Sequence, residues 1–453
     1  MEHIPVSSKA LRHNILTIAV PISLQSLFQA SLSVIDQVMV GQLGTNSIAA
    51  IGLGARFANL FLITAAAMGT SASIMISQYC GNHDAQGVNH TFVSNGFLAS
   101  VITLIFLLPS LLCAQPIIGL YTTDMTVIPM AADYLRIMAI GYIPLLGTTM
   151  LSTVLRSTGY AKFPMVAGIV SVITNTLLNY ILIFGMFGAP KLGLNGTAIA
   201  TTVSRFVECL ILLYFFHKSQ QKSEFRIRLY CTMPISFLKQ TVLIASPIVL
   251  NEFLWGFGET VYAAIYGHIG TEQMAAMTLT APIQSLSIGL FTGFSTAAAI
   301  LVGNHLGKDE KEPAFALSRK FIKLGIFGSV GLGILLVLLS NWYTDFFDVS
   351  PSTKQITIWI LYVFAAVLFV KVSNMIMSGG ILRSGGKTKY TLLLDVLGTW
   401  TIGVPLGFLA AFVWNLPIHW VYFFISVEEI VRFLLGLAIF ESKRWIQNIT
   451  VSA

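Results

Sequence analysis

Stretches of about 20 apolar residues, the length that crosses a bilayer as an α-helix, recur along the whole chain. Short connections that are polar or contain glycine separate them. The pattern predicts an all-α polytopic membrane protein with twelve transmembrane helices. They are expected near residues 15–40, 47–79, 92–114, 128–154, 163–187, 194–216, 240–266, 274–305, 320–342, 356–381, 390–414 and 417–441.

The first of these stretches carries polar residues on one helix face. Gln25, Gln29, Ser33 and Asp36 follow one another at intervals of three or four residues, so they share a face. Polar groups that faced lipid would be left unsolvated in hydrocarbon. The stripe is therefore expected to face other helices or a water-filled cavity.

The chain repeats itself at an offset of 226 or 227 positions. The stretch that begins at Pro21 returns at Pro247, 226 positions later, and Leu-Arg-Ser at 155–157 returns at 382–384. A stable offset of about half the chain indicates two homologous halves. Six spans per half give both halves the same orientation, so a substrate site is expected between them.

The repeat predicts two pseudo-symmetric six-helix lobes, residues 1–217 and 240–453. The segment between them, 218–239, is polar and basic, and it is expected to be a cytoplasmic linker.

Composition excludes a soluble protein, since only 10% of the residues are charged and 55% are hydrophobic. Most of the 26 Lys and Arg residues fall on one side of the predicted helices. This asymmetry places both termini in the cytoplasm, with the protein in the cell membrane. The basic balance is therefore explained by topology, and no nucleic-acid partner is expected. The four cysteines show no paired spacing, which argues against a disulfide framework or a metal site.

Ionisable groups inside membrane helices are candidate functional residues. Asp36 has no partner on its own helix, so a proton or a metal cation could neutralise it. The alternative is a structural carboxylate satisfied by hydrogen bonds. Asn175 and Asn179 stand four apart on one face and could complete a site with Asp36. Two such Asn residues also serve to pack membrane helices together.

The second half repeats the polar stripe with different residues. Asn251 replaces Gln25 and Tyr262 replaces Asp36, while Glu252 and Glu259 stand seven apart on one face. With Asp395, these glutamates are three lone acids in one lobe, which favours an acidic cavity. For another set of charges, pairing along one helix is the preferred interpretation. That set comprises Arg205 with Glu208, and Glu428 or Glu429 with Arg432.

The sequence does not indicate an enzyme. Gly386-Lys387-Thr388 has the end of a phosphate-binding loop, but Ile381 stands where the first glycine is needed. Neither a metalloprotease motif nor a serine-nucleophile elbow is present.

Several segments resemble motifs of the multidrug and toxic compound extrusion (MATE) transporters, and the resemblance covers essentially the whole chain. These segments are Pro21 with 36–41, then 155–159, 175–185, 193–201 and 382–386.

The resemblance implies a monomeric secondary antiporter that exports drugs, toxins or metabolites in exchange for Na⁺ or H⁺ by alternating access. The coupling ion would be the only cofactor. The family's cation-binding acid falls on Asp36, which would bind the metal if the ion is Na⁺. Its partners fall on Asn175, Asn179 and Thr201, and the seventh-helix acid falls on Glu252.

The expected substrate cavity has a defined set of residues, and its acids predict an amphiphilic organic cation as substrate. The set is Gln25, Gln29, Asn251, Glu252, Glu259, Tyr262 and Asp395. A flippase for lipid-linked precursors, distantly related within the same superfamily, is the main alternative, and it would need basic groups in that cavity. A channel or a structural membrane protein is a further alternative. However, two lobes with unlike charge patterns favour alternating access over a symmetric pore.

Overall fold

The computed structural model describes residues 8–43, 45–122, 124–221, 227, 234–345, 347 and 349–450, and helices are the only regular elements in this part of the chain. The membrane-length segments are α1 (Ser8–Gly41), α2 (Thr45–Gly81), α3 (Ala85–Leu112), α5 (Val127–Ile140) with α6 (Tyr142–Ser157), α7 (Lys162–Phe184), α8 (Leu194–Gln220), α9 (Ile235–Ile269), α10 (Thr271–Gly307), α11 (Lys311–Asp345), α12 (Pro351–Asn374) with η2 (Met375–Leu382), α13 (Lys389–Val396) with η3 (Leu397–Gly403), α14 (Val404–Phe408) and η4 (Leu409–Val413), and α15 (Ile418–Glu441).

These segments correspond to the twelve predicted spans. Nine helices of the described chain are long and apolar enough to cross a membrane, and α5 with α6, bent by 40°, makes a tenth. The 34-residue α1 and the 24-residue α15 complete the set. Two short elements in the connections, α4 (Ala114–Gly119) and η1 (Met186–Gly188), were not expected from the sequence.

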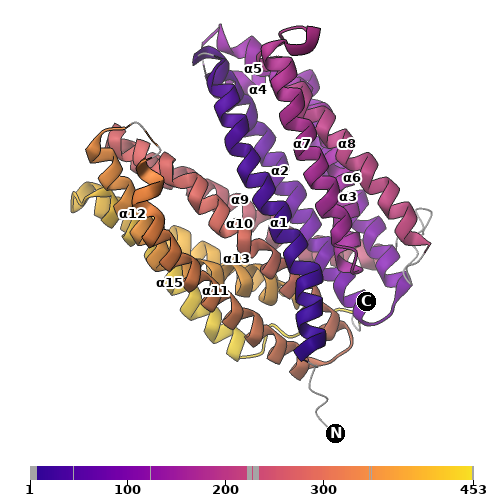
Figure 1. Ribbon diagram of the computed structural model, residues 1–453. Coiled ribbons are helices and arrows are strands. Elements are labelled where there is room, and N and C mark those ends of the chain that lie inside the picture. The colour runs from indigo at the N-terminus through magenta and orange to yellow at the C-terminus, as the bar shows by residue number, and fades with distance from the viewer. Residues whose placement is uncertain are drawn as a thin grey trace. The chain divides into compact units, whose positions relative to one another are not determined.

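The chain forms two compact units, residues 24–245 and residues 1–23 with 246–452, which we call the N-terminal and C-terminal units (Figure 1). The first turns of α1 belong to the C-terminal unit, where Ser23 Oγ donates to the Leu290 carbonyl over 2.6 Å. A Cβ at Gly293 of α10 would overlap the Ala19 carbonyl, so glycine is needed where these helices cross. The expected linker spans residues 218–239. Its two ends belong to α8 and α9, and residues 222–226 and 228–233 lie outside the described residues.

Backbone geometry repeats at the same offset as the sequence. The turn after α2 has His83 at φ 54°, and the turn after α10 has Asp309, 226 positions later, at φ 59°. The Leu-Arg-Ser segments are each followed by a left-handed glycine, Gly159 at φ 90° and Gly386 at φ 76°. Glycine adopts this conformation without the steric penalty of a Cβ. The two halves therefore share local structure as well as residues.

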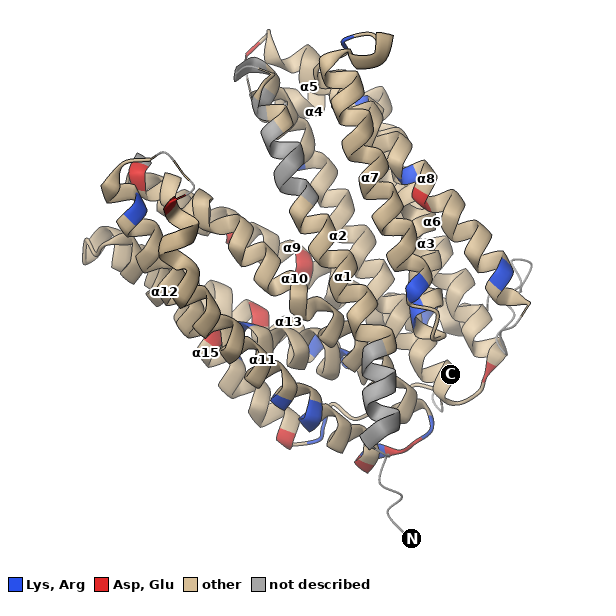
Figure 2. Ribbon diagram, viewed as in Figure 1, with Lys and Arg blue, Asp and Glu red and all other residues tan. Residues whose placement is uncertain are grey.

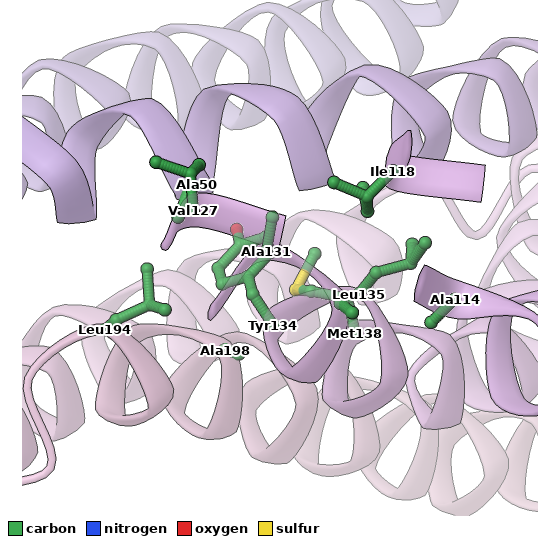
Figure 3. Close-up of a cluster of buried hydrophobic side chains, with 11 residues drawn as sticks. Ala50, Ala114, Ile118, Val127, Ala131, Tyr134, Leu135, Met138, Leu194 and Ala198 are labelled. Atoms are coloured by element: carbon green, nitrogen blue, oxygen red, sulfur yellow. The ribbon is translucent and has the colours of Figure 1, made fainter. Parts of the chain in front are cut away.

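Small side chains allow close packing in the N-terminal unit. Ala50 of α2, Ala131 of α5 and Ala198 of α8 are fully buried around Tyr134 (Figure 3). In membranes, helices associate through such close contacts, because lipid is as apolar as the side chains themselves. This cluster packs α8, which carries Thr201, against α5, and α5 against α2.

Candidate functional site

The polar stripe of the first helix is partly described. Asp36 and Ser33 lie on α1, but their side chains are outside the described part of the structure. Gln29 is exposed. Gln25 is buried and accepts a 2.7 Å hydrogen bond at Oε1 from Arg156 Nη2, at the end of α6. Gln25 is thus held by an arginine at the end of the fourth span.

The predicted partners of Asp36 lie together. Asn179 Nδ2 donates to Asn175 Oδ1 over 3.2 Å, and Asn175 Nδ2 donates to Thr201 Oγ1 over 3.3 Å. Asn179 is fully buried. The four-residue spacing on α7 places the amides on one face, and the packing of α7 beside α8 brings Thr201 to them (Figure 1). The structure thus brings these three residues together.

A further acid lies close by in the N-terminal unit. Glu208 of α8 interacts with Ser171 of α7 and lies near both Arg156 and Arg205. The sequence suggested only the pairing of Glu208 with Arg205 along α8. Arg156 therefore has Gln25 on one side and Glu208 on another.

The C-terminal unit repeats the Gln25–Arg156 contact as an ion pair. Arg383 Nη1 lies 2.9 Å from Glu252 Oε1, and the two residues are 131 positions apart, as Gln25 and Arg156 are. The equivalent of Gln25 in this contact is therefore Glu252, at an offset of 227. The sequence comparison had aligned Gln25 with Asn251 instead.

Asp395 of α13 bridges two helices. Its Oδ2 accepts a 2.7 Å hydrogen bond from Asn251 Nδ2 of α9, and its Oδ1 lies 2.7 Å from Arg432 Nη1 of α15. The Arg432 side chain is 9% exposed and the Asp395 side chain 15% exposed, so the pair is largely shielded from water.

Arg432 contacts three carboxylates in all. Besides Asp395, its Nη2 lies 2.8 Å from Glu428 Oε1 and 3.6 Å from Glu429 Oε1. The predicted pairing along α15 is therefore confirmed, but it is part of a larger network. Tyr262 of α9 is buried and donates to Glu428 Oε2 over 2.6 Å. The predicted cavity residue Tyr262 thus anchors α9 to α15.

Two residues of α12 that the sequence left unassigned extend this network. Lys371 Nζ lies 3.3 Å from Glu429 Oε1, and Asn374 Nδ2 donates to Glu429 Oε2 over 2.7 Å. Asn374 also donates to the Glu429 carbonyl over 2.8 Å. The sequence contained the charges, but it could not indicate which helices would meet.

Glu259 differs from the other acids of this unit. It is exposed, and in the described part of the chain it forms neither a hydrogen bond nor an ion pair. Lys371, Glu428, Glu429 and Arg432 are near enough to act on it electrostatically. Glu259 is therefore an accessible carboxylate beside a buried charge network.

These contacts correct one inference from the sequence. Glu252, Glu259 and Asp395 were expected to be three lone acids, but Glu252 is paired with Arg383 and Asp395 with Arg432. The pairs form because a buried carboxylate without a partner would be strongly destabilising. The acidic excess comes from the whole network instead, which joins Asp395, Glu428, Glu429 and nearby Glu259 to two bases, Lys371 and Arg432.

The sequence profile of the MatE family matches this chain twice, over residues 21–181 and 247–409. The chain belongs to the MATE family of transporters. The two matches begin 226 positions apart, at the two prolines that mark the repeat. As a MATE protein it is a multi-pass membrane transporter of small molecules and not an enzyme.

Curated relatives cover most of the chain. "Probable multidrug resistance protein NorM" of Bacillus licheniformis is 28% identical over 407 residues, which is 87% of each chain. A protein with the same name from Thermotoga maritima is 24% identical, over 96% of this chain and 93% of the relative. "Uncharacterized transporter YisQ" of Bacillus subtilis is 23% identical, over 91% and 90% of the two chains.

Solved MATE structures share the fold. A MATE protein in the straight conformation has a TM-score of 0.87 at 20% identity, over 96% of this chain and 97% of that one. An outward-facing multidrug resistance MATE transporter of the MOP superfamily has the same score, identity and coverage. The MATE fold of twelve helices in two pseudo-symmetric six-helix lobes, expected from the repeat, is confirmed.

Proposed function

We propose that this MATE transporter is a secondary antiporter that exports amphiphilic organic cations in exchange for Na⁺ or H⁺ by alternating access. The observation that carries the proposal is the charge balance of the C-terminal unit. Four acids, Asp395, Glu428, Glu429 and Glu259, lie with only two bases on membrane helices. Relatives named multidrug resistance proteins support export of drug-like compounds.

The acids suit a cationic substrate for a physical reason. Coulomb attraction between unit charges is several times stronger where water is partly excluded than in bulk water. Glu259 is the member of this group that is exposed and free of an ion pair in the described structure. We assign it the first contact with the substrate cation, while the ion pairs behind it hold α9, α12, α13 and α15 in place.

Ion coupling is assigned to the N-terminal unit. The Asn179–Asn175–Thr201 chain supplies neutral oxygens on α7 and α8, and Asp36 on α1 supplies the carboxylate. Carboxylate, amide and hydroxyl oxygens suit a hard cation such as Na⁺, and a carboxylate in a membrane helix also suits a proton. Both ions therefore remain in the proposal.

Transport by purified protein in liposomes tests the proposal. A cationic dye on one side is followed after a gradient of Na⁺ or H⁺ is imposed, with protein-free liposomes and a neutral dye as controls. We expect the cationic dye to cross the membrane only when the imposed Na⁺ or H⁺ gradient drives that ion in the opposite direction. No dye movement under either gradient, combined with rescue of cells that lack a lipid-precursor flippase, would replace antiport by the flippase function.

A further inference from the structure

A basic hollow lies where α11 begins and α15 ends in the C-terminal unit. Its volume is about 530 Å³. Charged residues of both signs gather in this region (Figure 2). The lining residues are Glu312, Phe315, Ala316, Arg319, Lys320, Lys323, Glu441 and Lys443.

Ion pairs form one wall of the hollow. Arg319 Nη2 lies 2.8 Å from Glu441 Oε2, and Lys443 Nζ lies 2.7 Å from Glu312 Oε1. The Arg319 guanidinium and the Lys443 ammonium each lie 4.7 Å from the ring centroid of buried Phe315, within cation–π range. Both cations are thereby held in place in the lining of the hollow.

Two further lysines give the hollow its positive charge. Lys320 and Lys323 are exposed, and neither has an acidic partner in the described part of the chain. With the two paired cations, four basic groups face two carboxylates. An anion that entered the hollow would meet uncompensated positive charge.

The same face of α11 continues into a lipid-facing stripe. Spacings of three, four and seven residues place Lys320 and Lys323 in line with Phe327, Ile334 and Leu338. The last three are 75%, 59% and 72% exposed. Apolar side chains this exposed on a membrane helix face acyl chains. The hollow therefore lies directly at the end of a lipid-facing surface.

The geometry points to a binding site for an anionic phospholipid, with the phosphodiester between Lys320 and Lys323 and the acyl chains along the α11 stripe. Basic pockets next to membrane helices bind such headgroups through charge. A soluble phosphate would share the lysines but would leave the adjoining apolar stripe unused. The site binds a phospholipid of the surrounding membrane. Its assignment does not depend on which substrate or coupling ion the transporter uses.

Native mass spectrometry of the full-length protein in detergent tests this site, with phosphatidylglycerol and phosphatidylcholine as probes. We expect phosphatidylglycerol to bind at least about tenfold more tightly, since the choline group adds a positive charge near the lysines. The variant K320Q/K323Q should lose about tenfold in affinity for phosphatidylglycerol. The control K218Q/K239Q, which removes two exposed lysines of the N-terminal unit, should stay within about twofold.

A second variant tests the site by blocking it without changing its charge. Its result does not depend on whether the lysine variant folds. Ala316 is exposed and lines the hollow, so Ala316→Trp should block the headgroup while it keeps every lysine. Three results would each overturn the proposal. They are equal affinity for the two lipids, a loss of affinity in K218Q/K239Q equal to that in K320Q/K323Q, and unchanged binding to Ala316→Trp. Displacement of the lipid by millimolar glycerol 3-phosphate would also overturn it, because the site would then select a soluble phosphate.

Discussion

Arg383 Nη1 lies 2.9 Å from Glu252 Oε1, and 227 positions earlier Arg156 donates to Gln25 at 2.7 Å. The same helix-to-helix contact thus occurs in each half, once as an ion pair and once as a hydrogen bond to a neutral amide. An arginine at the end of the fourth or tenth span reaches the middle of the first or seventh. The repeat preserved the contact, while the charge of the partner changed.

This relationship predicts how Glu252 tolerates substitution. Glu252→Gln should lower the free energy of unfolding by less than about 1.5 kcal/mol, because a glutamine can accept from Arg383 as Gln25 does from Arg156. Glu252→Leu should lower it by about 3–5 kcal/mol, since the buried guanidinium loses its partner. Chemical unfolding of the purified protein in detergent measures both. A leucine variant as stable as the wild type would show that the pair does not stabilise the fold.

Arg432 should be the most sensitive basic residue of the C-terminal unit. Arg432→Met would leave Asp395, Glu428 and Glu429 together without that cation, and we expect a loss of about 3–5 kcal/mol. The matched control is Arg136→Met, because Arg136 forms an exposed pair with Asp133 at 2.9 Å. The control should change stability by less than about 1 kcal/mol. Similar losses in both variants would contradict the role of the network.

Asp36 should be required for coupling and not for folding. Asp36→Asn is expected to insert and fold, yet to lose efflux driven by an ion gradient, because the neutral amide neither takes up a proton nor carries the negative charge that attracts a metal cation. Asp133→Asn, which changes an exposed acid of the same unit, is the control and should keep efflux. Gradient-driven dye transport in liposomes is the measurement. Full coupling in a well-folded Asp36→Asn protein would exclude the assignment.

Glu259 should select for positive charge in the substrate. Glu259→Gln is expected to lower efflux of a cationic dye by about tenfold, the effect of about 1.4 kcal/mol of lost attraction. Export of a neutral compound should fall much less. In the double variant Glu252→Gln/Glu259→Gln, the loss of cationic dye efflux should exceed the loss of neutral export by at least as much. Glu272→Gln, at the exposed start of α10, serves as the control. Equal losses for cationic and neutral compounds would contradict a charge effect.

Topology is open to a direct test. The Lys and Arg distribution predicts that position 45 lies outside the cell and position 220 inside. Single cysteines at Thr45 and Gln220 should therefore react with an impermeant reagent from outside only in the first case. The background must lack native cysteines, because Cys113 is exposed. Labelling of position 220 in intact cells would reverse the orientation.

Hydrophobic runs and an internal repeat determined the fold class. Each predicted span is found as a helix, because a membrane helix must satisfy its own backbone and bury about 20 apolar residues. The Asn179–Asn175–Thr201 contact was predictable as well, from a four-residue spacing on α7 and the family resemblance. These features depend on neighbours along the chain or on the repeat.

Only the tertiary structure decided which charges meet. Lys371 pairs with Glu429 and Asp395 with Arg432 across different helices. An apolar helix gives almost no signal of which face meets which neighbour, because lipid and helix interiors are equally apolar. The sequence therefore showed Glu252, Glu259 and Asp395 as unpartnered. Their bases come from distant segments, and helix packing brings them together, leaving Glu259 as the exposed carboxylate beside the network.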